Sequence, residues 1–531
     1  MCGLLSYEGD VKNLPDFEST FNKLRHRGPD DTEIMKVNGG EASVCFHRLA
    51  IMDPTQKGHQ PFVDESSGNV ITCNGEIYNF ETLRHDYEKD YHFKSHSDCE
   101  VLVPMFRDLG IEGMCQHLDA EFALVIWDNK KKKLVAGRDP IGIRPLYYGY
   151  TTENKIIFAS EMKVLTPFCE RVEAFPPGHY FDGDKFVQYK DLTTVAQYSL
   201  KNLDKHLTDI REKLIEGVRK RLVADVPVGF LLSGGLDSSL VCGIAQHILK
   251  KPITTFSVGL DHNPIDIGYA KIVADYLKTD HHEVYFNKQD TLGVLDKLIW
   301  HLETWDITTI RASIGMYLVC KYIHEKTKIK VVLTGEISDE LFGYKYTDFA
   351  PSAEAFQKEA KKRVDELYMY DVLRADRCIA ANSLEARVPF GDLDFVQTVM
   401  EIHPEFKLNT TGMGKWLLRK AFDGTKFIPD EILWREKAAF SDAVGHSMVD
   451  YLKEYAEGIY TEKDVAAAKE KYPFGTPFTK ESLLYRDIFE KHFKGQSHTI
   501  KDFWMPNKEW SNCNVNDPSA RVLPNYGKSG V

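Results

Sequence analysis

The chain of 531 residues lacks the features of a membrane or secreted protein. Its apolar runs, such as residues 122–127, are far shorter than the ~18 residues that a membrane helix needs. The first twelve residues have no basic region, and Glu8 interrupts them before the apolar core of a signal peptide could form. We therefore expect a cytoplasmic protein with no membrane partner.

Positive charge is not in excess either. Lys and Arg number 67 against 79 Asp and Glu, which gives a net charge of −12. This charge argues against a protein that binds nucleic acid without regard to its sequence. With 43% hydrophobic and 27% charged residues the chain is an ordinary folded protein, and its length predicts two to four domains. This balance is compatible with an enzyme that acts on small substrates.

Cysteine pairs at metal-binding spacing are also missing. The ten cysteines are scattered, with no CxxC pair and no histidine cluster at zinc spacing, so we expect most to be buried reduced thiols. Cys2 differs because it directly follows Met1. Removal of Met1 would leave a thiol (pKa ~8.5) and an α-amine (pKa ~7.7–8.0) on one residue, where the amine can accept the thiol proton. On position alone, however, a cysteine there by chance is the better interpretation.

Residues 1–195 have the pattern of an α+β domain. Strands are predicted over 70–73, 122–127, 134–138 and 156–160, and helices over 80–87 and 99–109. Turn signals separate the strands, and Asn74-Gly75 is one of them. Short strands of this kind predict antiparallel sheets packed face to face, with flanking helices.

Near residue 200 the pattern changes. Apolar residues recur at helical spacing at Leu207, Ile210, Leu214, Val218 and Leu222. Strands predicted over 227–232, 253–258, 283–286 and 330–333 then alternate with helices that begin at 238 and span 270–277. This alternation predicts βαβ units and hence an α/β domain with a parallel sheet over residues 205–531, mainly helical from 358 and irregular after 504.

Four segments of the first domain carry polar groups that an ordinary hydrophobic core would not need: residues 26–30, 47–50, 74–79 and 97–98. Singly, each could be a turn or a surface charge. Together with Cys2-Gly3, and in this order, they resemble the class II glutamine amidotransferase domain, a member of the N-terminal nucleophile hydrolases.

That resemblance implies a glutamine site. Cys2 would attack the side-chain amide, while the Asn74 side chain and the Gly75 backbone N–H would form an oxyanion hole. Arg48 would hold the glutamine α-carboxylate, and Glu76 and Asp98 its ammonium group. The implied glutamine-binding residues are Arg48, Leu49, Ala50, Ile51, Met52, Asn74, Gly75, Glu76 and Asp98. The implied chemistry is a thioester, release of ammonia, and hydrolysis to glutamate.

A second motif, SGGLDSS over residues 233–239, follows a predicted strand and opens a helix. Backbone N–H groups of such a loop can bind an anion, although a Ser-Gly turn before a helix is often only a cap. No GKS or GKT follows, so it is not a Walker A motif, nor is it a GxGxxG fingerprint. It resembles the pyrophosphate loop of ATP pyrophosphatases. Residues 334–343 form an acidic segment after another strand, and Asp237 and Asp339 could share a Mg²⁺ ion.

The whole chain resembles the glutamine-hydrolysing asparagine synthetases. Further matching segments are residues 304–313, 384–390, 433–437, 440–442, 504–506 and 517–521. The resemblance implies that aspartate and Mg-ATP give β-aspartyl-AMP and pyrophosphate, and that ammonia, arriving through an internal passage, displaces AMP. It also implies a homodimer, with glutamine, aspartate and ATP as the small-molecule partners.

The resemblance assigns residues of the second domain as follows. The implied ATP-binding residues are Leu232, Ser233, Gly234, Gly235, Asp237, Ser238, Ser239, Val258, Thr334 and Gly335. Thr308, Thr309 and Arg311 would bind aspartate. Glu336 would act as a general base, and Lys437 would offset charge on the departing pyrophosphate.

Several positions depart from the family pattern: Thr334, Ile337, Gly343, Gly391, Ala438 and Ala443. Ile337 stands where glycine is usual, and a β-branched residue would be strained there if φ must be positive. We predict that synthesis survives, because Asp237, Glu336, Asp339, Arg311 and Lys437 are all present.

Other interpretations compete with this one. A β-lactam synthetase has a similar domain pair but typically no working nucleophile, and other class II amidotransferases lack SGGLDSS. The chain could also be a glutamine hydrolase with an impaired synthetase site, or a non-catalytic sensor of glutamine and nucleotide. Retention of both polar sets disfavours the sensor.

Overall fold

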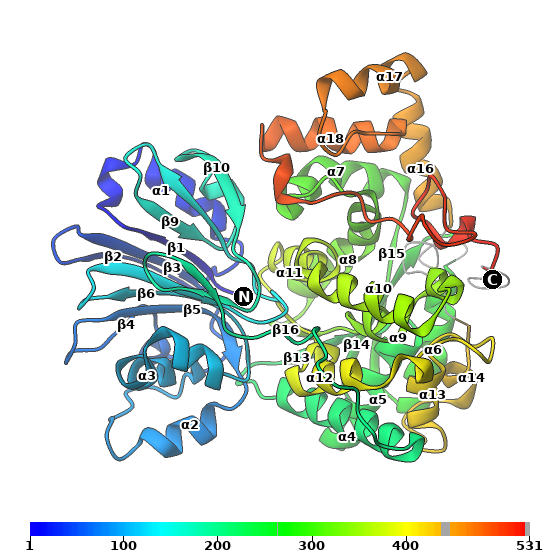
Figure 1. The fold of residues 1–531 in the computed structure, drawn as a ribbon, viewed down its shortest axis with the longest axis horizontal. Coiled ribbons are helices and arrows are strands. Elements are labelled where there is room, and N and C mark those ends of the chain that lie inside the picture. Colours follow the sequence, from blue (N-terminus) through cyan, green and yellow to red (C-terminus); the bar gives the residue numbers. More distant parts are fainter. Residues whose placement is uncertain (263, 437–445, 526–531) are drawn as a thin grey trace. The chain divides into compact units, whose positions relative to one another are not determined.

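The computed structural model describes residues 1–262, 264–436 and 446–525 (Figure 1). By its internal contacts the chain divides into two compact units. The first comprises residues 1–191, 224–226 and 380–385, and the second comprises residues 192–223, 227–379 and 386–531.

The first unit contains two six-stranded antiparallel sheets. The order of the first sheet is β10-β8-β9-β1-β3-β2, and that of the second is β12-β11-β7-β6-β5-β4. The strands of the first sheet are β1 (Gly3–Tyr7), β2 (Asp31–Val37), β3 (Ala42–Arg48), β8 (Tyr147–Thr151), β9 (Ile156–Ala159) and β10 (Cys169–Ala174). Those of the second are β4 (Phe62–Val63), β5 (Val70–Ile77), β6 (Ala120–Asp128), β7 (Lys133–Arg138), β11 (His179–Phe181) and β12 (Phe186–Gln188). The helices are α1 (Phe17–Phe21), α2 (Phe80–Tyr87) and α3 (Leu102–His117). The predicted α+β sandwich is confirmed.

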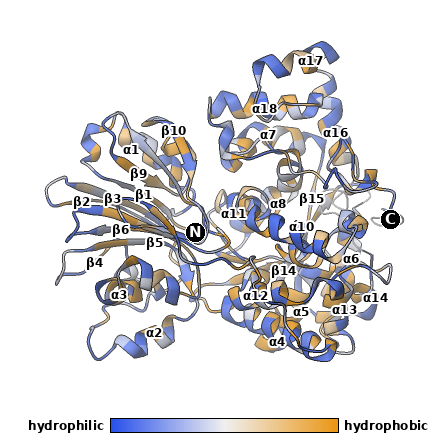
Figure 2. Ribbon diagram, in the orientation of Figure 1, coloured by the Kyte–Doolittle hydropathy of each residue, from blue (hydrophilic) through white to orange (hydrophobic). Residues whose placement is uncertain are grey.

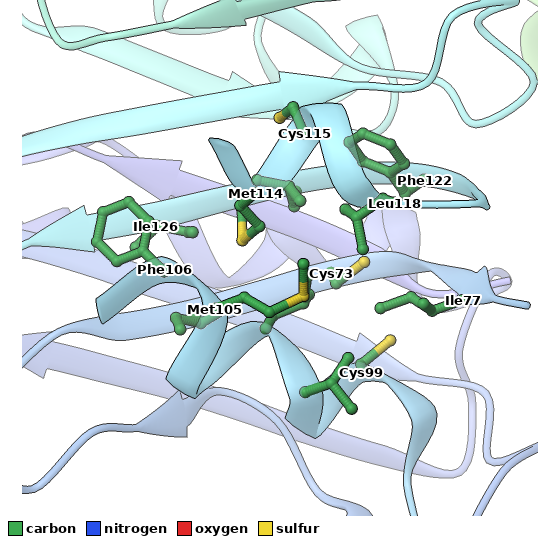
Figure 3. Close-up of a cluster of buried hydrophobic side chains, with 14 of the residues drawn as sticks. Cys73, Ile77, Cys99, Met105, Phe106, Met114, Cys115, Leu118, Phe122 and Ile126 are labelled. Carbon is green, nitrogen blue, oxygen red and sulfur yellow. The ribbon is translucent and has the colours of Figure 1, made fainter. Parts of the chain in front are cut away.

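Residues 122–127 of strand β6 are apolar without interruption, and the packing of the strand explains this. Side chains alternate across a strand, and here both faces of the sheet are covered. Ala123, Val125 and Trp127 pack into a core that also contains residues of the first sheet. Phe122 and Ile126 face the other way, into a core with helix α3 (Figure 3).

Strand β5 corrects one prediction. It runs through Asn74-Gly75, where the sequence pattern predicted a turn. A turn is excluded because residues 74 and 75 pair with Ala123 and Phe122 of β6. Glycine is needed at 75, since a Cβ there would lie 2.5 Å from the carbonyl oxygen of Glu121.

The second unit is built on a sheet of order β15-β14-β13-β16-β17, in which β13, β14, β15 and β16 are parallel. The strands are β13 (Val228–Leu231), β14 (Thr254–Leu260), β15 (Asp280–Phe286), β16 (Val331–Leu333) and β17 (Glu385–Arg387). This confirms the predicted α/β class. The order reverses at β13, since β14 lies on one side of it and β16 on the other, and ligands of such sheets bind at the carboxyl ends of the strands at that point.

Helices surround this sheet. The longer ones are α4 (Leu203–Arg221), α5 (Leu236–Leu249), α6 (Ile265–Leu277), α7 (Lys288–Leu302), α8 (Ile307–Lys326), α10 (Ala353–Asp365), α11 (Asp371–Ala380), α16 (His446–Glu457), α17 (Glu462–Lys471) and α18 (Lys480–His492). Shorter ones are α9 (Ser338–Phe342), α12 (Leu393–Glu401), α13 (Trp416–Phe422) and α14 (Asp430–Leu433). Figure 2 shows polar and apolar residues alternating along α4, whose predicted stripe is confirmed by the burial of Ile210, Leu214 and Val218. None of the described helices is long and apolar enough to span a membrane.

Lys407 is a buried cation that faces neutral groups. It follows a short 3₁₀ helix (Pro404–Phe406), and its Nζ donates to Gln357 Oε1 at 2.8 Å and to the Val399 carbonyl at 3.0 Å. Burial lowers the pKa of the Lys407 ammonium to about 7. In the unfolded chain a lysine titrates near pH ~10.4.

This difference predicts a pH dependence of stability. Between about pH 7 and pH ~10.4 the unfolded state holds a proton that the folded state has lost, so the Lys407 contribution to the free energy of unfolding rises with pH. Lys407→Met removes that contribution, along with two hydrogen bonds whose loss costs the same at every pH. We expect the melting temperature of the variant, relative to the native chain, to be lower at pH 9 than at pH 7. A difference that stays constant between these pH values would contradict the prediction.

Candidate functional site

The first polar site lies in the first unit, where Cys2 directly precedes β1, Arg48 ends β3 and Asn74 lies in β5. The backbone N–H of Cys2 donates to Asn74 Oδ1 at 2.8 Å, and Cys2 Sγ lies 3.9 Å from the Leu49 carbonyl oxygen. Asn74 is 1% exposed, and its Nδ2 has no hydrogen-bond partner in the described parts of the chain. A buried amide donor without a partner is costly, and beside a thiol it is placed to bind an oxygen that carries negative charge.

Arg27 holds the backbone at Cys2. Its Nε donates to the Cys2 carbonyl at 2.9 Å, and its Nη1 pairs with Glu161 at 2.7 Å, both side chains being buried. Met1 is itself buried, with its ammonium nitrogen 3.5 Å from a Glu385 oxygen. Burial raises the pKa of the Cys2 thiol and lowers that of the Met1 ammonium. With Met1 attached, the thiol is therefore not activated.

Arg48 organises the loop after β3. Its guanidinium donates to the carbonyl oxygens of Thr55 at 2.8 Å, Met52 at 3.3 Å and Asp53 at 2.5 Å. These three bonds leave two of its five N–H groups for a ligand. The intervening residues Leu49, Ala50 and Ile51 are buried, and the Ala50 N–H donates to Asp30.

Two buried carboxylates complete this site. Glu76 follows Gly75 in β5, and Asp98 begins a 3₁₀ helix (Asp98–Val101). Asp98 Oδ2 accepts the Ile77 N–H at 2.8 Å, which ties this short helix to β5. Short contacts thus link Cys2 to Leu49 and Asn74, and Asp98 to β5. That these residues together bind glutamine stays a prediction.

The second site is a cavity of about 210 Å³ in the second unit. Its described lining includes eight of the ten residues predicted to bind ATP: Leu232, Ser233, Gly235, Asp237, Ser238, Val258, Thr334 and Gly335. Gly234 and Ser239 do not line it. Ser239 and Thr334 each have a buried hydroxyl oxygen with no hydrogen-bond partner among the described residues.

The loop from β13 to α5 depends on close backbone packing. Gly234 has φ +71°, and a Cβ on it would lie 2.4 Å from the Ala270 nitrogen. A Cβ on Gly335 would lie 2.8 Å from the Ser238 nitrogen, so the loops after β13 and β16 meet at their backbones. Ser233 and Ser238 join their hydroxyls at 2.9 Å within the first loop.

A lysine that the motifs did not identify joins these two loops. Lys415 Nζ lies 2.8 and 2.9 Å from the two Asp237 oxygens and 2.6 Å from Asp339 Oδ1. It also donates to the Ser338 hydroxyl at 2.9 Å. The two carboxylates predicted to share a cation thus do converge on one positive charge. Lys415 lies 178 positions from Asp237, and no local pattern marks it.

A carboxylate and a guanidinium meet on another wall of the cavity. Glu336 pairs with Arg374, which also lies 3.0 Å from Asp371. Burial raises the pKa of Glu336, and the Arg374 charge opposes that rise. A carboxyl with a raised pKa in a cavity is a candidate for proton transfer.

The residues predicted to bind aspartate are not all in the cavity. Thr308 lines it, but Thr309 and Arg311 are absent from its described lining. The Thr309 N–H and hydroxyl both donate to Asp306, at 2.7 and 2.8 Å. Arg311 uses its fork on two other carboxylates, Glu481 and Asp517, at 2.5–3.1 Å. Four of the five N–H groups of Arg311 are thus engaged by carboxylates of the chain. A contact between Arg311 and aspartate stays a prediction.

Among the positions that depart from the family pattern, Ile337 is strained. It has φ +82° and ψ −22°, is 1% exposed, and lines the cavity just before α9. Gly343, at the other end of α9, has φ +97°. Lys437, Ala438 and Ala443 lie outside the described residues.

The strain at Ile337 predicts an unusual order of stability. Ile337→Ala and Ile337→Gly both remove the buried side chain, but only glycine adopts this backbone freely. Because the left-handed conformation costs an L-residue roughly 1–2 kcal/mol, we expect the glycine variant to be more stable than the alanine variant by about 1 kcal/mol. Denaturant unfolding of the two variants measures this. An alanine variant that is equally stable or more stable would show that no strain is stored there.

Comparison with known proteins assigns each of the two parts of the chain to a family. The family described as "Glutamine amidotransferase domain" matches residues 1–192, and the family described as "Asparagine synthase" matches residues 209–358 and 348–516. The probable glutamine-hydrolyzing asparagine synthetase of Acanthamoeba polyphaga mimivirus is 40% identical, covering 99% of this chain and 100% of the relative. The probable enzyme of Schizosaccharomyces pombe is 40% identical, covering 98% of each chain. The glutamine-hydrolyzing asparagine synthetase of Homo sapiens is 40% identical and covers both chains completely. The chain belongs to the family of glutamine-hydrolysing asparagine synthetases.

Proposed function

We propose that this protein makes asparagine from aspartate, using ATP to activate the carboxylate and glutamine as the source of nitrogen. The observation that carries the proposal is that one chain of this family assembles both polar sets, one around Cys2 and Asn74 and the other around Asp237 and Lys415. The ten free thiols fit a reducing compartment, and we place the reaction in the cytoplasm. The homodimer stays a prediction.

In the first site, removal of Met1 would leave the α-amine on Cys2 itself. That amine takes the thiol proton, and Sγ attacks the amide carbon of glutamine. The oxygen of the tetrahedral intermediate accepts hydrogen bonds from Asn74 Nδ2 and from the Gly75 N–H. The amine returns the proton as ammonia leaves, and water hydrolyses the thioester to glutamate. Arg48 binds the α-carboxylate through its remaining N–H groups.

Glu76 and Asp98 bind the ammonium group of the substrate. Both are buried at β5, beside the predicted oxyanion hole. A zwitterion that places its carboxylate at Arg48 and its ammonium at these acids is fixed at both ends, which orients its side-chain amide toward Cys2.

In the second site, the aspartate side-chain carboxylate attacks the α-phosphorus of ATP, and pyrophosphate leaves. The loop of residues 233–239 holds the phosphates by its backbone N–H groups and hydroxyls. Ammonia then attacks the acyl carbon of β-aspartyl-AMP and AMP departs. Glu336 accepts the proton that the attacking nitrogen loses. Lys437, which lies outside the described residues, offsets the charge of the departing pyrophosphate.

Asp237 and Asp339 are the residues that would hold Mg²⁺. No group of three or more His, Cys, Asp or Glu side chains able to bind a metal occurs in the described ranges. Mg²⁺, however, is often bound by one or two carboxylates together with substrate phosphates, and these two carboxylates face one cation. When bound, the ion would neutralise phosphate charge.

A product assay tests the function as a whole. Glutamate, pyrophosphate and asparagine are measured together with glutamine, ATP, Mg²⁺ and aspartate present, and again without aspartate. We expect asparagine and pyrophosphate only when aspartate is present. Cys2→Ala should abolish glutamine-dependent asparagine, and ammonium chloride should restore it, because the nucleophile serves only to release ammonia. A protein that binds glutamine and nucleotide but forms none of these products would be a sensor.

A second variant tests the partnerless amide of Asn74. Asn74→Ala removes both the oxyanion donor and the acceptor for the Cys2 N–H, and we expect the rate of glutamine hydrolysis to fall about 10²–10³-fold. The ammonium-dependent synthesis of asparagine should stay within about 2-fold, since the synthetase residues are untouched. A similar loss in both reactions would indicate misfolding instead of a lost donor.

The strain at Ile337 favours one second candidate, a glutamine hydrolase whose synthetase site is impaired. The family pattern has glycine there, and Ile337 directly follows Glu336. The same assay separates the two functions, because the impaired protein would form glutamate but no pyrophosphate from aspartate and ammonium.

A further inference from the structure

The C-terminal segment of residues 504–520 supplies part of the cavity wall in the second unit. Trp504, Pro518, Ser519 and Ala520 line the same cavity as the loop of residues 233–239. Apart from a short 3₁₀ helix (Ala520–Val522), the described part of this tail has no regular structure. Its position must therefore come from side-chain contacts with other elements.

One anchor is Asp306, which caps the start of α8. Its Oδ1 accepts the Trp504 N–H at 2.7 Å, while its Oδ2 accepts the N–H and hydroxyl of Thr309. Thr308, next in the same helix, donates to the Trp504 carbonyl at 3.5 Å. Asp306 is fully buried, so this junction excludes water.

A second anchor is Arg363 of α10. Its Nη2 donates to the Met505 carbonyl at 2.6 Å, and its guanidinium lies 4.6 Å from the centroid of the Trp504 ring. Its Nε donates to the Tyr346 hydroxyl at 2.9 Å and to Glu359 at 2.7 Å. A cation over an indole face, fixed on its other side by hydrogen bonds, sets the position of that ring.

The third anchor is Arg311, which joins three elements. From α8 it donates to both oxygens of Glu481 in α18 and to both oxygens of Asp517 in the tail. Asp517 Oδ1 also accepts the N–H of Ser519 at 2.8 Å, and Ser519 lines the cavity. The fork of Arg311 thus acts on the cavity wall through Asp517.

A second cavity, of about 190 Å³, lies behind this part of the tail. Arg311, Glu481 and Asp517 line it, and Pro518 lines both cavities. A wall with space on both sides is not braced by close packing. Polar contacts therefore hold residues 517–519, and the Arg311–Asp517 pair is the most buried of those described.

We propose that the tail is a fixed wall of the aspartate subsite, and that Arg311 and Asp517 are positioning residues that hold it without touching substrate. This inference rests on the proposed function. Trp504 contacts Thr308 and Arg363, and Arg363 and Arg374 are cations of the cavity that suit a small dicarboxylate. Leu232, directly after β13, and Val258, in β14, give the same cavity apolar lining.

The test uses Asp517→Asn in the full-length protein. It keeps the size of the side chain but removes the charge that Arg311 needs for a bidentate pair. We expect the KM for aspartate, measured by pyrophosphate release with saturating ammonium, to rise about 10- to 100-fold, with the KM for ATP within about 3-fold. Glutamine hydrolysis should be unchanged. Asp517→Glu should restore part of the affinity for aspartate.

Lys453→Met provides a matched control. Lys453 Nζ pairs with the same carboxylate at 2.7 Å, but its side chain is 45% exposed, so that pair contributes little. We expect this variant to keep the native KM for aspartate. An Asp517→Asn protein with native KM values, or with equal effects of both variants, would overturn the proposal, as would a loss of kcat alone.

Hydrogen exchange separates this inference from the proposed function. Backbone amides of residues 504–520 should exchange faster in Asp517→Asn than in the native chain, while those of α5 and β13 stay the same. If exchange is faster in Asp517→Asn but the native protein forms no pyrophosphate, the proposed function fails and the anchoring role of Asp517 stands. Unchanged exchange would overturn the anchoring role itself.

Discussion

A single buried ammonium group holds the second unit's site together. Lys415 Nζ neutralises Asp237 after β13 and Asp339 after β16, and it reaches Ser338 between them. Two carboxylates at the ends of neighbouring parallel strands would otherwise repel one another in a partly dry cavity. Lys415 offsets that repulsion where the two loops approach so closely that Gly335 has no room for a Cβ beside Ser238. The first loop is compact as well, since the Ser233 N–H donates to the Ser238 hydroxyl and the Gly235 N–H donates to the Ser233 hydroxyl.

In the first unit a neutral side chain, that of Asn74, fixes the residues of the site. Asn74 accepts from the Cys2 N–H with its oxygen, and its nitrogen is a buried donor without a partner among the described residues. One side chain both fixes the nucleophile and provides the charge-stabilising group, so the two cannot drift apart. In both units, then, a single side chain from a distant part of the sequence determines the geometry of residues that belong to a recognisable motif.

Much of the fold was predictable because its cause is local. The apolar run of β6 and the stripe of α4 follow from the period of each element. Helix α8 had no such signal, since most of its twenty residues are buried and it therefore has no polar face. The turn at Asn74-Gly75 was predicted wrongly because Asn-Gly is a common hairpin turn in proteins. Only the tertiary contacts with Cys2 and Glu121 explain why it lies within a strand here.

The candidate sites were predictable in their motifs but not in their partners. The charge of Arg311 and its place in the motif suggest a contact with substrate. In the structure its guanidinium instead binds Glu481 and Asp517, which lie 170 and 206 positions away in the sequence. Lys415 carries no motif and is visible only in three dimensions. For Ile337 the sequence could predict strain only if φ is positive. The structure shows that φ is positive at this residue, which directly precedes α9.

The placement of Asn74-Gly75 also bears on the chemical ageing of the protein. In flexible chains an asparagine followed by glycine readily deamidates, because the glycine nitrogen can reach the side-chain carbonyl. Within β5 the backbone is extended, and the side-chain oxygen is already bonded to Cys2, so this attack is disfavoured. Conversion to aspartate would replace an oxyanion donor by a negative charge. The strand thus preserves the identity of the residue that the chemistry needs.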